Sequence, residues 1–401
     1  MTLPVKIYVV GGAIRDELMG MSVKDCDYVV VGSTPEDMLA KGFKPVGRGF
    51  PVFLHPETHE EYALARTESK TTFGYHGFVF FYAPSVTLEQ DLARRDFTMN
   101  AIARELMDDG SLSDTLIDPY EGVKAIEARL FHHVSEAFVD DPVRILRCAR
   151  FAARFPDFTV APETLILMRR MTKNGEVDAL VPERVWQELS RGLMEKKPSR
   201  MLDILRDTGA ATRILPEVDI DIHVLTALDF AAIKMFPLPV RFAILIHSLG
   251  KEMMLDGSSL RNIAYEGRSV DCLKFLCERL CVPAECRELA KIVVRELNHI
   301  HGSERLSVSE LVSLLERCDA FRRPKRFEGI LQACESLDVH SGGRNTSYSR
   351  RHYLMQTLEV ARSVNAGIFA ERYAGNGAKI KAALHAARVD FLSVWLDVHS
   401  D

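Results

Sequence analysis

The pattern of hydrophobic residues changes once along this chain, near residue 139. Before that point, short β-branched and aromatic runs such as "YVVVG" (28–32) and "FVFFYAP" (78–84) are typical of strands. Beyond it, stretches such as "DDPVRILRCARFAARF" (140–155) and "PERVWQELSRGLMEK" (182–196) have helical periodicity. A strand-rich segment followed by a long helical remainder predicts an α+β fold, with an N-terminal mixed-sheet head and an elongated all-helical neck, body and tail.

The chain is long enough for several domains, because its 401 residues exceed one typical domain. Pro, Gly and Ser gather at 195–200, 215–223 and 338–349, which predicts joints at these places. Together with the change of periodicity, the joints predict four segments: a head at 1–138, a neck at 139–205, a body at 206–340 and a tail at 341–401.

Net charge and hydropathy exclude some classes of protein. With a formal charge of −5 the chain is not uniformly basic, although nucleic-acid binding depends on where cations cluster. The N-terminal stretch "MTLPVKIYVVGG" lacks the charged region and cleavage site of a signal peptide. No apolar stretch approaches the length of about 18 residues that a membrane span needs. We therefore expect a cytoplasmic protein with no membrane partner.

Two carboxylates follow a glycine pair near the N-terminus. Residues 6–10 predict a strand, Gly11-Gly12 a tight turn and residues 13–20 a helix, a geometry that lets backbone N–H groups approach phosphate. In the next predicted strand, Asp25 and Asp27 are two residues apart and point to the same face. Carboxylates so close repel each other unless a cation lies between them, and Mg²⁺ suits such oxygen ligands. The alternative is a strand that begins with solvated aspartates.

A second charged motif is "DLARRDFTMNAIA" (91–103), in which Arg94, Arg95 and Asp96 precede an apolar segment. Adjacent arginines can donate bidentate hydrogen bonds to phosphate, and an aspartate can accept them from ribose hydroxyls. The alternative is a solvated helix start.

A third motif begins with Asp140 and Asp141 and continues with Arg144, Arg147 and Arg150, which recur every three residues. On a helix this spacing holds the three arginines on one broad side. The alternative is an ordinary charged helix face.

Taken together, the motifs "GGAIRD", "DCD", "RRDFTMNA", "DDPVRILR" and "PERVWQE" resemble those of the class II tRNA nucleotidyltransferases. These are the CCA-adding enzymes of the polymerase-beta-like nucleotidyltransferase superfamily. The resemblance implies a nucleotidyltransferase head and an enzyme that rebuilds the 3′-terminal CCA of tRNA from CTP and ATP without a nucleic-acid template. It also implies a two-metal transfer with Mg²⁺ that releases pyrophosphate, and a tRNA partner bound through its acceptor arm and elbow. No obligate protein partner is inferred.

The same resemblance implies roles for individual residues. Asp25 and Asp27 are the catalytic carboxylates that hold Mg²⁺, and the residues expected to bind ATP or CTP are Gly12, Arg15, Arg95, Asp141, Arg144 and Arg147. Asp141 and Arg144 match the family's amino-acid template, in which a carboxylate accepts and a guanidinium donates hydrogen bonds at a base edge. The template usually begins with Glu, and Asp140 replaces it here. The "PERVWQE" segment is expected to be a supporting helix.

Three further parts of the chain also carry expectations. A loop within 66–78 is expected to help the pocket change from C to A, which favours full CCA addition. In the body, related enzymes carry a phosphohydrolase with a His-Asp doublet, but here Ser248 follows His247, and His223 remains upstream. We therefore expect no metal-dependent hydrolase. The cations expected to track tRNA phosphates are Arg344, Arg350, Arg351, Lys379, Lys381 and Arg388.

Three alternatives to a CCA-adding enzyme stay open at this point. One is a bacterial poly(A) polymerase, which shares the head motifs. Another is an A-adding-only relative. The third is a non-catalytic tRNA-binding relative, which the presence of both Asp25 and Asp27 disfavours.

Overall fold

The computed structural model describes residues 4–23, 25–46, 51–70, 78–249, 261–339 and 346–398. Most of the loop expected at 66–78, and Arg344, lie outside these residues. The chain forms two compact units, which we call unit 1 (residues 1–185 and 203–214) and unit 2 (residues 186–202 and 215–401). The four-segment division is finer than this and stays a prediction.

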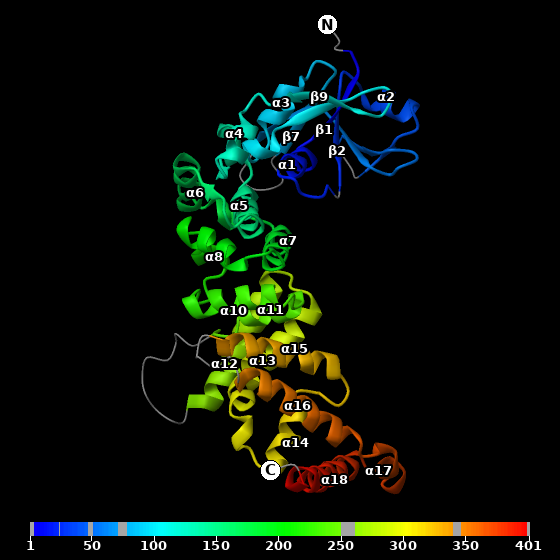
Figure 1. The fold of residues 1–401 in the computed structure, drawn as a ribbon, viewed down its shortest axis with the longest axis vertical. Coiled ribbons are helices and arrows are strands. Elements are labelled where there is room, and N and C mark those ends of the chain that lie inside the picture. The colour runs from blue at the N-terminus through cyan, green and yellow to red at the C-terminus, as the bar shows by residue number, and fades with distance from the viewer. Residues whose placement is uncertain are drawn as a thin grey trace. The chain divides into compact units, whose positions relative to one another are not determined.

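A seven-stranded mixed sheet forms the head of unit 1 (Figure 1). In spatial order its strands are β3 (Lys44–Pro45), β4 (Val52–Leu54), β5 (Glu61–Leu64), β2 (Asp27–Val31), β1 (Lys6–Val10), β8 (Ala103–Leu106) and β9 (Leu112–Ile117). β2 pairs in parallel with β5, and the other neighbours are antiparallel. The mixed-sheet head predicted from the sequence is thus confirmed.

The central strands are buried on both faces of the sheet. Tyr8 and Val10 of β1 point to one side, where they join a core that contains Leu92. Val9 points to the other side and packs against Ile14 of helix α1 (Gly12–Leu18). Full burial of each such side chain contributes roughly 1.5–3 kcal/mol, so these strands provide a firm base for the loops that leave them.

The glycine turn and the second strand differ from expectation in detail. Gly11 has the positive φ of 70°, and Gly12 is already the first residue of α1. The Gly11 N–H donates to the Ile102 carbonyl at 3.0 Å, which ties the turn to the neighbouring segment. β2 begins at Asp27, so Asp25 lies just before the strand and strand alternation does not fix its direction.

The remainder of unit 1 comprises short elements of the head and then mainly helices. Its further elements are α2 (Pro35–Ala40), β6 (Arg66–Lys70), β7 (Phe78–Tyr82), α3 (Leu88–Ala93), η2 (Thr98–Asn100), α4 (Gly122–Glu127), β10 (Leu130–Phe131), η3 (Glu136–Asp140), α5 (Val143–Arg154), β11 (Thr159–Val160), α6 (Pro162–Lys173), η4 (Glu176–Ala179) and α9 (Ala211–Ile214). Helices α7 (Pro182–Leu193) and α8 (Pro198–Asp207) follow α6 along the chain. Apart from the two-residue strand β11, the described chain beyond residue 139 is helical, as predicted.

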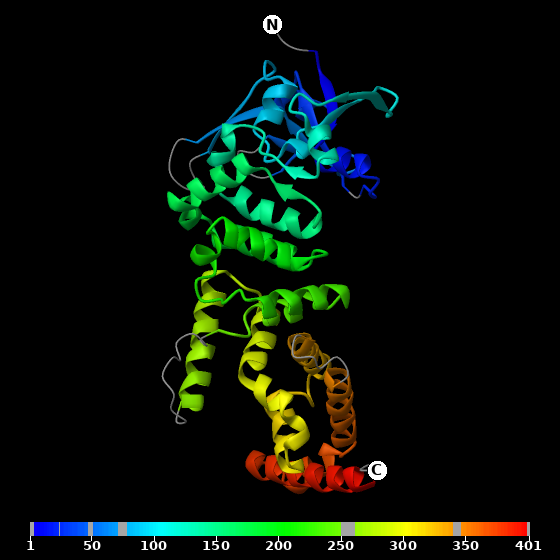
Figure 2. The same cartoon turned by 60° about the vertical axis from the view of Figure 1, so that its left-hand side comes forward.

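Unit 2 consists of helices in the described part of the chain (Figure 2). Besides the parts of α7 and α8 within residues 186–202, they are α10 (Ile222–Ile233), α11 (Leu238–Leu245), α12 (Arg261–Arg279), α13 (Ala284–His301), η5 (Ser303–Arg305), α14 (Val308–Arg317), α15 (Pro324–Asp338), α16 (Thr346–Arg362), α17 (Ala366–Arg372) and α18 (Gly377–Val398). The apolar helix α11 packs against α10, α13 and α15 and forms the centre of this unit.

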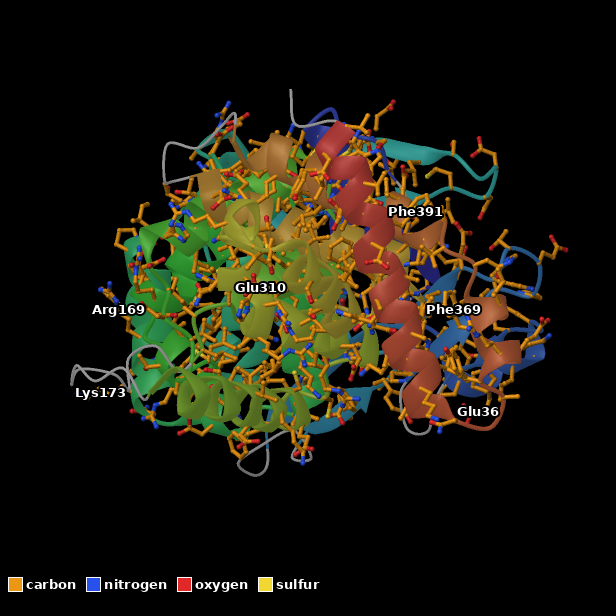
Figure 3. The ribbon with its side chains drawn as sticks, turned by 90° about the horizontal axis from the view of Figure 1, so that it is seen from below. Glu36, Arg169, Lys173, Glu310, Phe369 and Phe391 are labelled. Carbon is orange, nitrogen blue, oxygen red and sulfur yellow. The ribbon has the colours of Figure 1, made fainter. Side chains whose placement is uncertain are left out.

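The last helices of unit 2 expose apolar side chains. Phe391 of α18, which is labelled in Figure 3, is 51% exposed, and Val394 of the same helix is 65% exposed. Among the described residues, every helix is nevertheless too short or too polar to span a bilayer. The cytoplasmic location stays a prediction.

Candidate active site

A buried polar network joins the glycine turn, the "RRDFTMN" segment and helix α5 within unit 1. Arg15 is only 3% exposed, and its guanidinium donates to Asn100 Oδ1 at 2.6 Å and to Asp16 Oδ1 at 2.7 and 2.9 Å. Arg154, in the last turn of α5, donates to the other oxygen of Asp16 at 2.7 Å. Helix α5 is thereby fixed to helix α1, although 138 residues separate the two partners in sequence.

Asp96 makes the second connection between the head and α5. It is 7% exposed and accepts hydrogen bonds from Arg147 Nε at 2.8 Å, from Asn100 Nδ2 at 2.9 Å and from the Phe97 N–H at 2.8 Å. Burial alone would raise the pKa of Asp96, but Arg147, Asn100 and the Phe97 N–H together hold it well below its usual range. Asp96 is therefore an anchor for Arg147, and because its side chain is only 7% exposed it is poorly accessible to a ribose hydroxyl.

The arginines of this network lie over aromatic rings. The guanidinium carbon of Arg15 is 5.3 Å from the Phe151 ring centre and 5.2 Å from that of Phe155. Arg147 and Arg150 lie over the same Phe151 ring at 5.6 and 4.6 Å. Such cation–π contacts hold each planar cation in one orientation. The spacing of three residues along α5 thus collects arginines around Phe151.

Arg94 and Arg95, which are adjacent in sequence, have different surroundings. Arg94 is bound by Asp91 at 2.7 Å and by Glu68 at 2.8 Å. Arg95 Nη1 lies so close to the turn that a Cβ on Gly11 would be 2.8 Å from it, and the positive φ of Gly11 favours glycine independently of this space. Arg95 Nε is buried and has no hydrogen-bond partner in the described part of the chain. Burial lowers the pKa of Arg95, whereas Asp91 and Asp27 act to raise it, so Asp27 lies within electrostatic range.

Asp25 and Asp27, the two predicted metal ligands, are exposed just before and at the start of β2. Among the described residues, neither Asp25 nor Asp27 makes an ion pair or hydrogen bond through its side chain. Burial raises the pKa of the Cys26 thiol between them, and the charges of Glu60, Asp27 and Asp25 raise it further. No group of three or more metal-ligating side chains occurs within the described ranges. Two carboxylates nevertheless fit Mg²⁺, which is commonly held by one or two carboxylates plus substrate phosphates.

The expected base-reading pair lies at the start of α5. Asp141 Oδ1 accepts from the Val143 N–H at 3.1 Å, which satisfies a free donor of the first helical turn. Arg144 is 7% exposed and donates to the backbone carbonyls of Ala137, at 2.6 Å, and Arg94. Both template residues are therefore held in one orientation.

Arg184 is a residue of this site that sequence reasoning missed. It belongs to the "PERVWQE" segment and donates to both oxygens of Asp141, at 3.1 and 2.7 Å. The motif indicated a supporting helix, but its one arginine was not connected with the template aspartate 43 residues earlier. Only the fold reveals this pair.

The structure thus brings Arg15, Arg95, Asp141, Arg144 and Arg147 into one unit with the aspartate pair, and Gly12 opens helix α1 beside them. Asp25 and Asp27 are open to solvent, whereas Arg15 is enclosed by protein groups. The roles given to these residues from the resemblance stay predictions.

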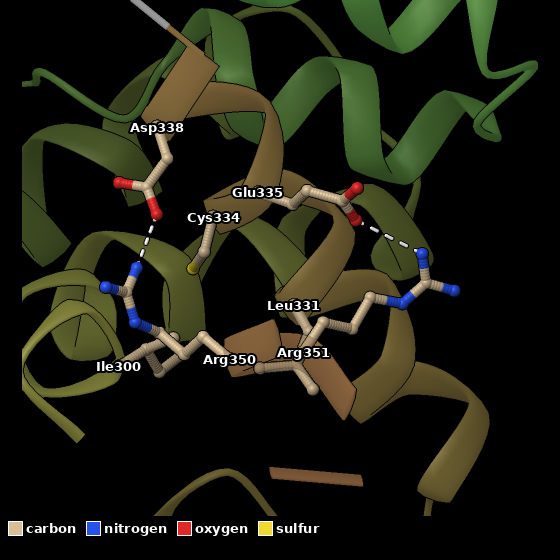
Figure 4. Close-up of a pocket in the computed structure, with 7 residues that line it drawn as sticks. All are labelled: Ile300, Leu331, Cys334, Glu335, Asp338, Arg350 and Arg351. Atoms are coloured by element: carbon tan, nitrogen blue, oxygen red, sulfur yellow. Dashed lines mark hydrogen bonds and ion pairs between the residues drawn. The ribbon is translucent and has the colours of Figure 1, made fainter. Parts of the chain in front are cut away.

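The region of unit 2 around His223 and His247, where related enzymes carry a phosphohydrolase centre, contains an aspartate that is already paired. The rings of His223 and His247 are 5.9 Å apart, and the buried Ser248 hydroxyl has no partner among the described residues. Asp338 Oδ1 faces His301 Nε2 at 3.3 Å, and Asp338 Oδ2 is bound by Arg350 at 2.5 Å. Figure 4 shows this ion pair in a pocket that is also lined by Ile300, Leu331, Cys334, Glu335 and Arg351.

The cations expected to track tRNA phosphates fall into two groups. Arg350, Arg351 and Arg388 pair with carboxylates of neighbouring helices. Lys379 and Lys381 are exposed on α18. Their role in binding tRNA stays a prediction.

Comparison with known proteins relates both units to one kind of enzyme. Residues 7–132 match the poly A polymerase head domain family, and residues 157–221 match the family described as a probable RNA- and SrmB-binding site of polymerase A. A multifunctional CCA protein from Burkholderia multivorans is 57% identical over 98% of this chain and 99% of its own length. One from Paraburkholderia phymatum is 58% identical, over 96% of each chain.

Solved structures resemble the fold at lower identity. The Thermotoga maritima CCA-adding enzyme complexed with tRNA matches 97% of this chain and 87% of its own, with a TM-score of 0.65 and 21% identity. A CCA-adding enzyme solved with CTP matches 97% of this chain and 87% of its own, with a TM-score of 0.69 and 21% identity. At this identity the likeness concerns the fold alone.

Proposed function

Because this chain belongs to the family of class II CCA-adding enzymes, we propose that it rebuilds the 3′-terminal CCA of tRNA from CTP and ATP. The reaction needs no nucleic-acid template. The terminal 3′ oxygen of the tRNA forms a bond to the α-phosphorus of the nucleotide, the bond from that phosphorus to the bridging oxygen breaks, and pyrophosphate leaves. The structural observation that carries the proposal is the pair of exposed carboxylates, Asp25 and Asp27, at the edge of the head that holds Gly11 and Arg95.

Membership of the nucleotidyltransferase family implies the use of divalent metal ions, and we propose Mg²⁺ held by Asp25 and Asp27. Bound Mg²⁺ supplies positive charge that stabilises the transferring phosphoryl group and activates the attacking hydroxyl. Arg95 lies beside the Gly11 turn, and among the described residues its Nε–H has no partner, so we propose that Arg95 binds triphosphate oxygens. Gly11 lets the backbone and the guanidinium approach each other closely.

The template pair accounts for the choice of nucleotide. Cytosine and adenine each carry an amino group, N4 and N6, at the edge where uracil and guanine carry a carbonyl oxygen. The Asp141 carboxylate only accepts hydrogen bonds, and the Arg144 guanidinium only donates them. An amino group therefore pairs with Asp141, whereas a carbonyl oxygen in that place faces a negative charge.

The helices of unit 2 and the tail cations are proposed to hold the acceptor arm and elbow of tRNA through its phosphates. The matched Thermotoga maritima enzyme was solved with tRNA, and other matched structures contain ATP or CTP. A-form RNA is recognised mainly through its shape and its backbone, so exposed cations such as Lys379 and Lys381 suit this role.

The test is to incubate the protein with Mg²⁺, CTP and ATP and a tRNA that ends at the discriminator base. We expect the sequence CCA and then termination. A poly(A) polymerase is the second candidate, because the family model matched by the head is named for that activity. It predicts repeated A addition instead. Addition of A only to tRNA that already ends in CC would identify an A-adding relative, and tRNA binding without any addition would identify a non-catalytic one.

A further inference from the structure

The Asp141 carboxylate is fixed by two separate contacts in unit 1. Arg184 Nη1 donates to Oδ1 at 3.1 Å and Nη2 donates to Oδ2 at 2.7 Å, so the guanidinium meets both oxygens at once. The Val143 N–H also donates to Oδ1 at 3.1 Å. A bidentate pair of this kind sets the plane of the carboxylate as well as its position. The Asp141 side chain is 19% exposed, so one part of it remains open.

One oxygen of the Asp141 carboxylate can still accept a further hydrogen bond. A carboxylate oxygen has two lone pairs, and Oδ1 of Asp141 uses both of them, for Arg184 and for Val143. Among the described residues, Oδ2 accepts only the bond from Arg184. One acceptor position on Oδ2 is therefore available, in a plane that Arg184 determines.

We propose that Arg184 is a positioning residue for nucleotide choice: it fixes Asp141 so that Oδ2 can accept from the amino group shared by cytosine and adenine. This inference rests on the proposed function and deepens it. Without Arg184 the carboxylate can rotate, and a rotating acceptor loses its preference for an amino group over a carbonyl. Lysine cannot replace Arg184, because a single ammonium does not form the two parallel bonds that set the plane.

The contacts of Arg144 differ from those of Asp141, and this difference makes Arg184 the informative residue to substitute. Its guanidinium is held by the backbone carbonyls of Ala137 and Arg94, which no side-chain substitution removes. Asp141 depends on a side chain for its second oxygen, and that side chain is Arg184. Substitution of Arg184 therefore releases the Asp141 carboxylate, while the Arg144 guanidinium stays in place.

The experiment compares Arg184→Met, Arg184→Gln and Arg184→Lys with Arg191→Met, in which an exposed arginine of the same helix is replaced. For each variant, kcat and KM are measured for CTP, ATP, UTP and GTP on matched tRNA substrates, together with tRNA affinity and thermal unfolding. We expect each Arg184 variant to lose about tenfold or more of its discrimination against UTP and GTP, equivalent to about 1.4 kcal/mol. All variants are expected to bind tRNA as tightly as the wild type. Arg191→Met is also expected to keep wild-type selectivity among the four nucleotides.

A double substitution tests whether Arg184 acts through Asp141. In an Asp141→Asn background, Arg184→Met is expected to add little further loss of selectivity, because the shared partner is already altered. Independent, fully additive losses would overturn the proposal. Full selectivity in Arg184→Lys would overturn it as well, since charge alone would then suffice. Failure of all three Arg184 variants to fold would assign the residue to stability and also overturn the proposal.

The outcome for the wild-type protein separates this inference from the proposed function. If the wild type adds neither C nor A to tRNA, the proposed function fails. If the wild type adds CCA selectively and the Arg184 variants keep that selectivity, only the positioning role fails.

Discussion

The head of unit 1 and the helical centre of unit 2 both gather acidic and basic side chains, but they differ in which carboxylates are bound by arginine. In the head, Asp16, Asp91 and Asp96 are bound by arginines, whereas Asp25 and Asp27 stay exposed. In unit 2, Asp338 is bound by Arg350 and faces His301. A carboxylate that already has a guanidinium partner has lost most of its attraction for a metal ion.

The difference shows that a cluster of titratable residues does not by itself indicate a reaction centre. In the head, the buried carboxylates bind arginines, whereas the exposed carboxylates remain available to bind a metal ion. Arg95 is held more loosely than its neighbour: its Nη2 lies 3.5 Å from Asp91 and its Nε lacks a partner among the described residues, whereas Arg94 is bound by Asp91 and Glu68 at 2.7 and 2.8 Å. We therefore propose that the exposed carboxylates, more than the number of charges, mark the reaction site.

The largest effect is expected at the exposed carboxylates. Asp25→Asn or Asp27→Asn removes a metal ligand, which should cost several kcal/mol of transition-state stabilisation and reduce nucleotide addition by at least about a hundredfold. Affinity for tRNA should change little. Single-turnover addition of CMP to tRNA measures the effect, with Asp108→Asn, an exposed aspartate at the β8–β9 connection, as the control. More than about a tenth of wild-type turnover in either variant would contradict the metal role and remove the contrast with unit 2.

The next effect concerns nucleotide choice at the start of α5. Arg144→Ala leaves the Ala137 and Arg94 carbonyls without their donor and removes the donating half of the template. A side-chain contact to a base edge is worth about 1–3 kcal/mol of discrimination, so discrimination against UTP and GTP should fall by roughly 5- to 150-fold and correct addition should slow. Arg170→Ala, at an exposed arginine of α6, is the control. Unchanged selectivity with weaker tRNA binding would place Arg144 on the phosphate-binding surface instead.

The sequence predicted the elements of this site better than their contacts. Strand β1, the glycine turn and helix α1 follow from local pattern, and so does the arginine side of α5. The pairs Arg15–Asn100 and Arg147–Asp96 join residues 85 and 51 positions apart, and no local pattern specifies such pairs. For the same reason the Arg184–Asp141 pair was missed, and the direction of Asp25 was inferred from a strand that begins only at Asp27.

A smaller effect is expected on stability at Asp96, which anchors α5 to the head. Its folded-state pKa lies below the unfolded value, so its ionised form stabilises the protein above about pH 4, and this contribution is lost as the pH falls through the folded pKa. Asp96→Asn should lower the free energy of unfolding by about 1–3 kcal/mol at pH 7. The difference from wild type should shrink below about pH 4, as urea unfolding at several pH values would show. Asp157→Asn, at an exposed ion pair, should have almost no effect at any pH, and an equal loss there would contradict the anchoring role.

The smallest effect is expected where the His-Asp doublet of related phosphohydrolases is restored. A hydrolytic metal centre needs several nitrogen or oxygen ligands around the ion and a bound water whose pKa the metal lowers. Ser248→Asp supplies one carboxylate beside His247, but Asp338 remains bound by Arg350. We therefore expect neither the wild type nor Ser248→Asp to hydrolyse 2′,3′-cAMP with added Ni²⁺, Mn²⁺ or Mg²⁺.

His247→Ala is the control for this last expectation. Its ring nitrogen Nδ1 lies 2.9 Å from the Ile244 carbonyl, so His247 already has a structural contact. Metal-stimulated hydrolysis that disappears in His247→Ala would show that the helical centre of unit 2 is a second working site. The combination of Ser248→Asp with Arg350→Gln goes one step further, because it also frees Asp338 from its guanidinium partner. Metal binding by the double variant, and not by Ser248→Asp alone, would identify Arg350 as the group that keeps this cluster closed to metal ions.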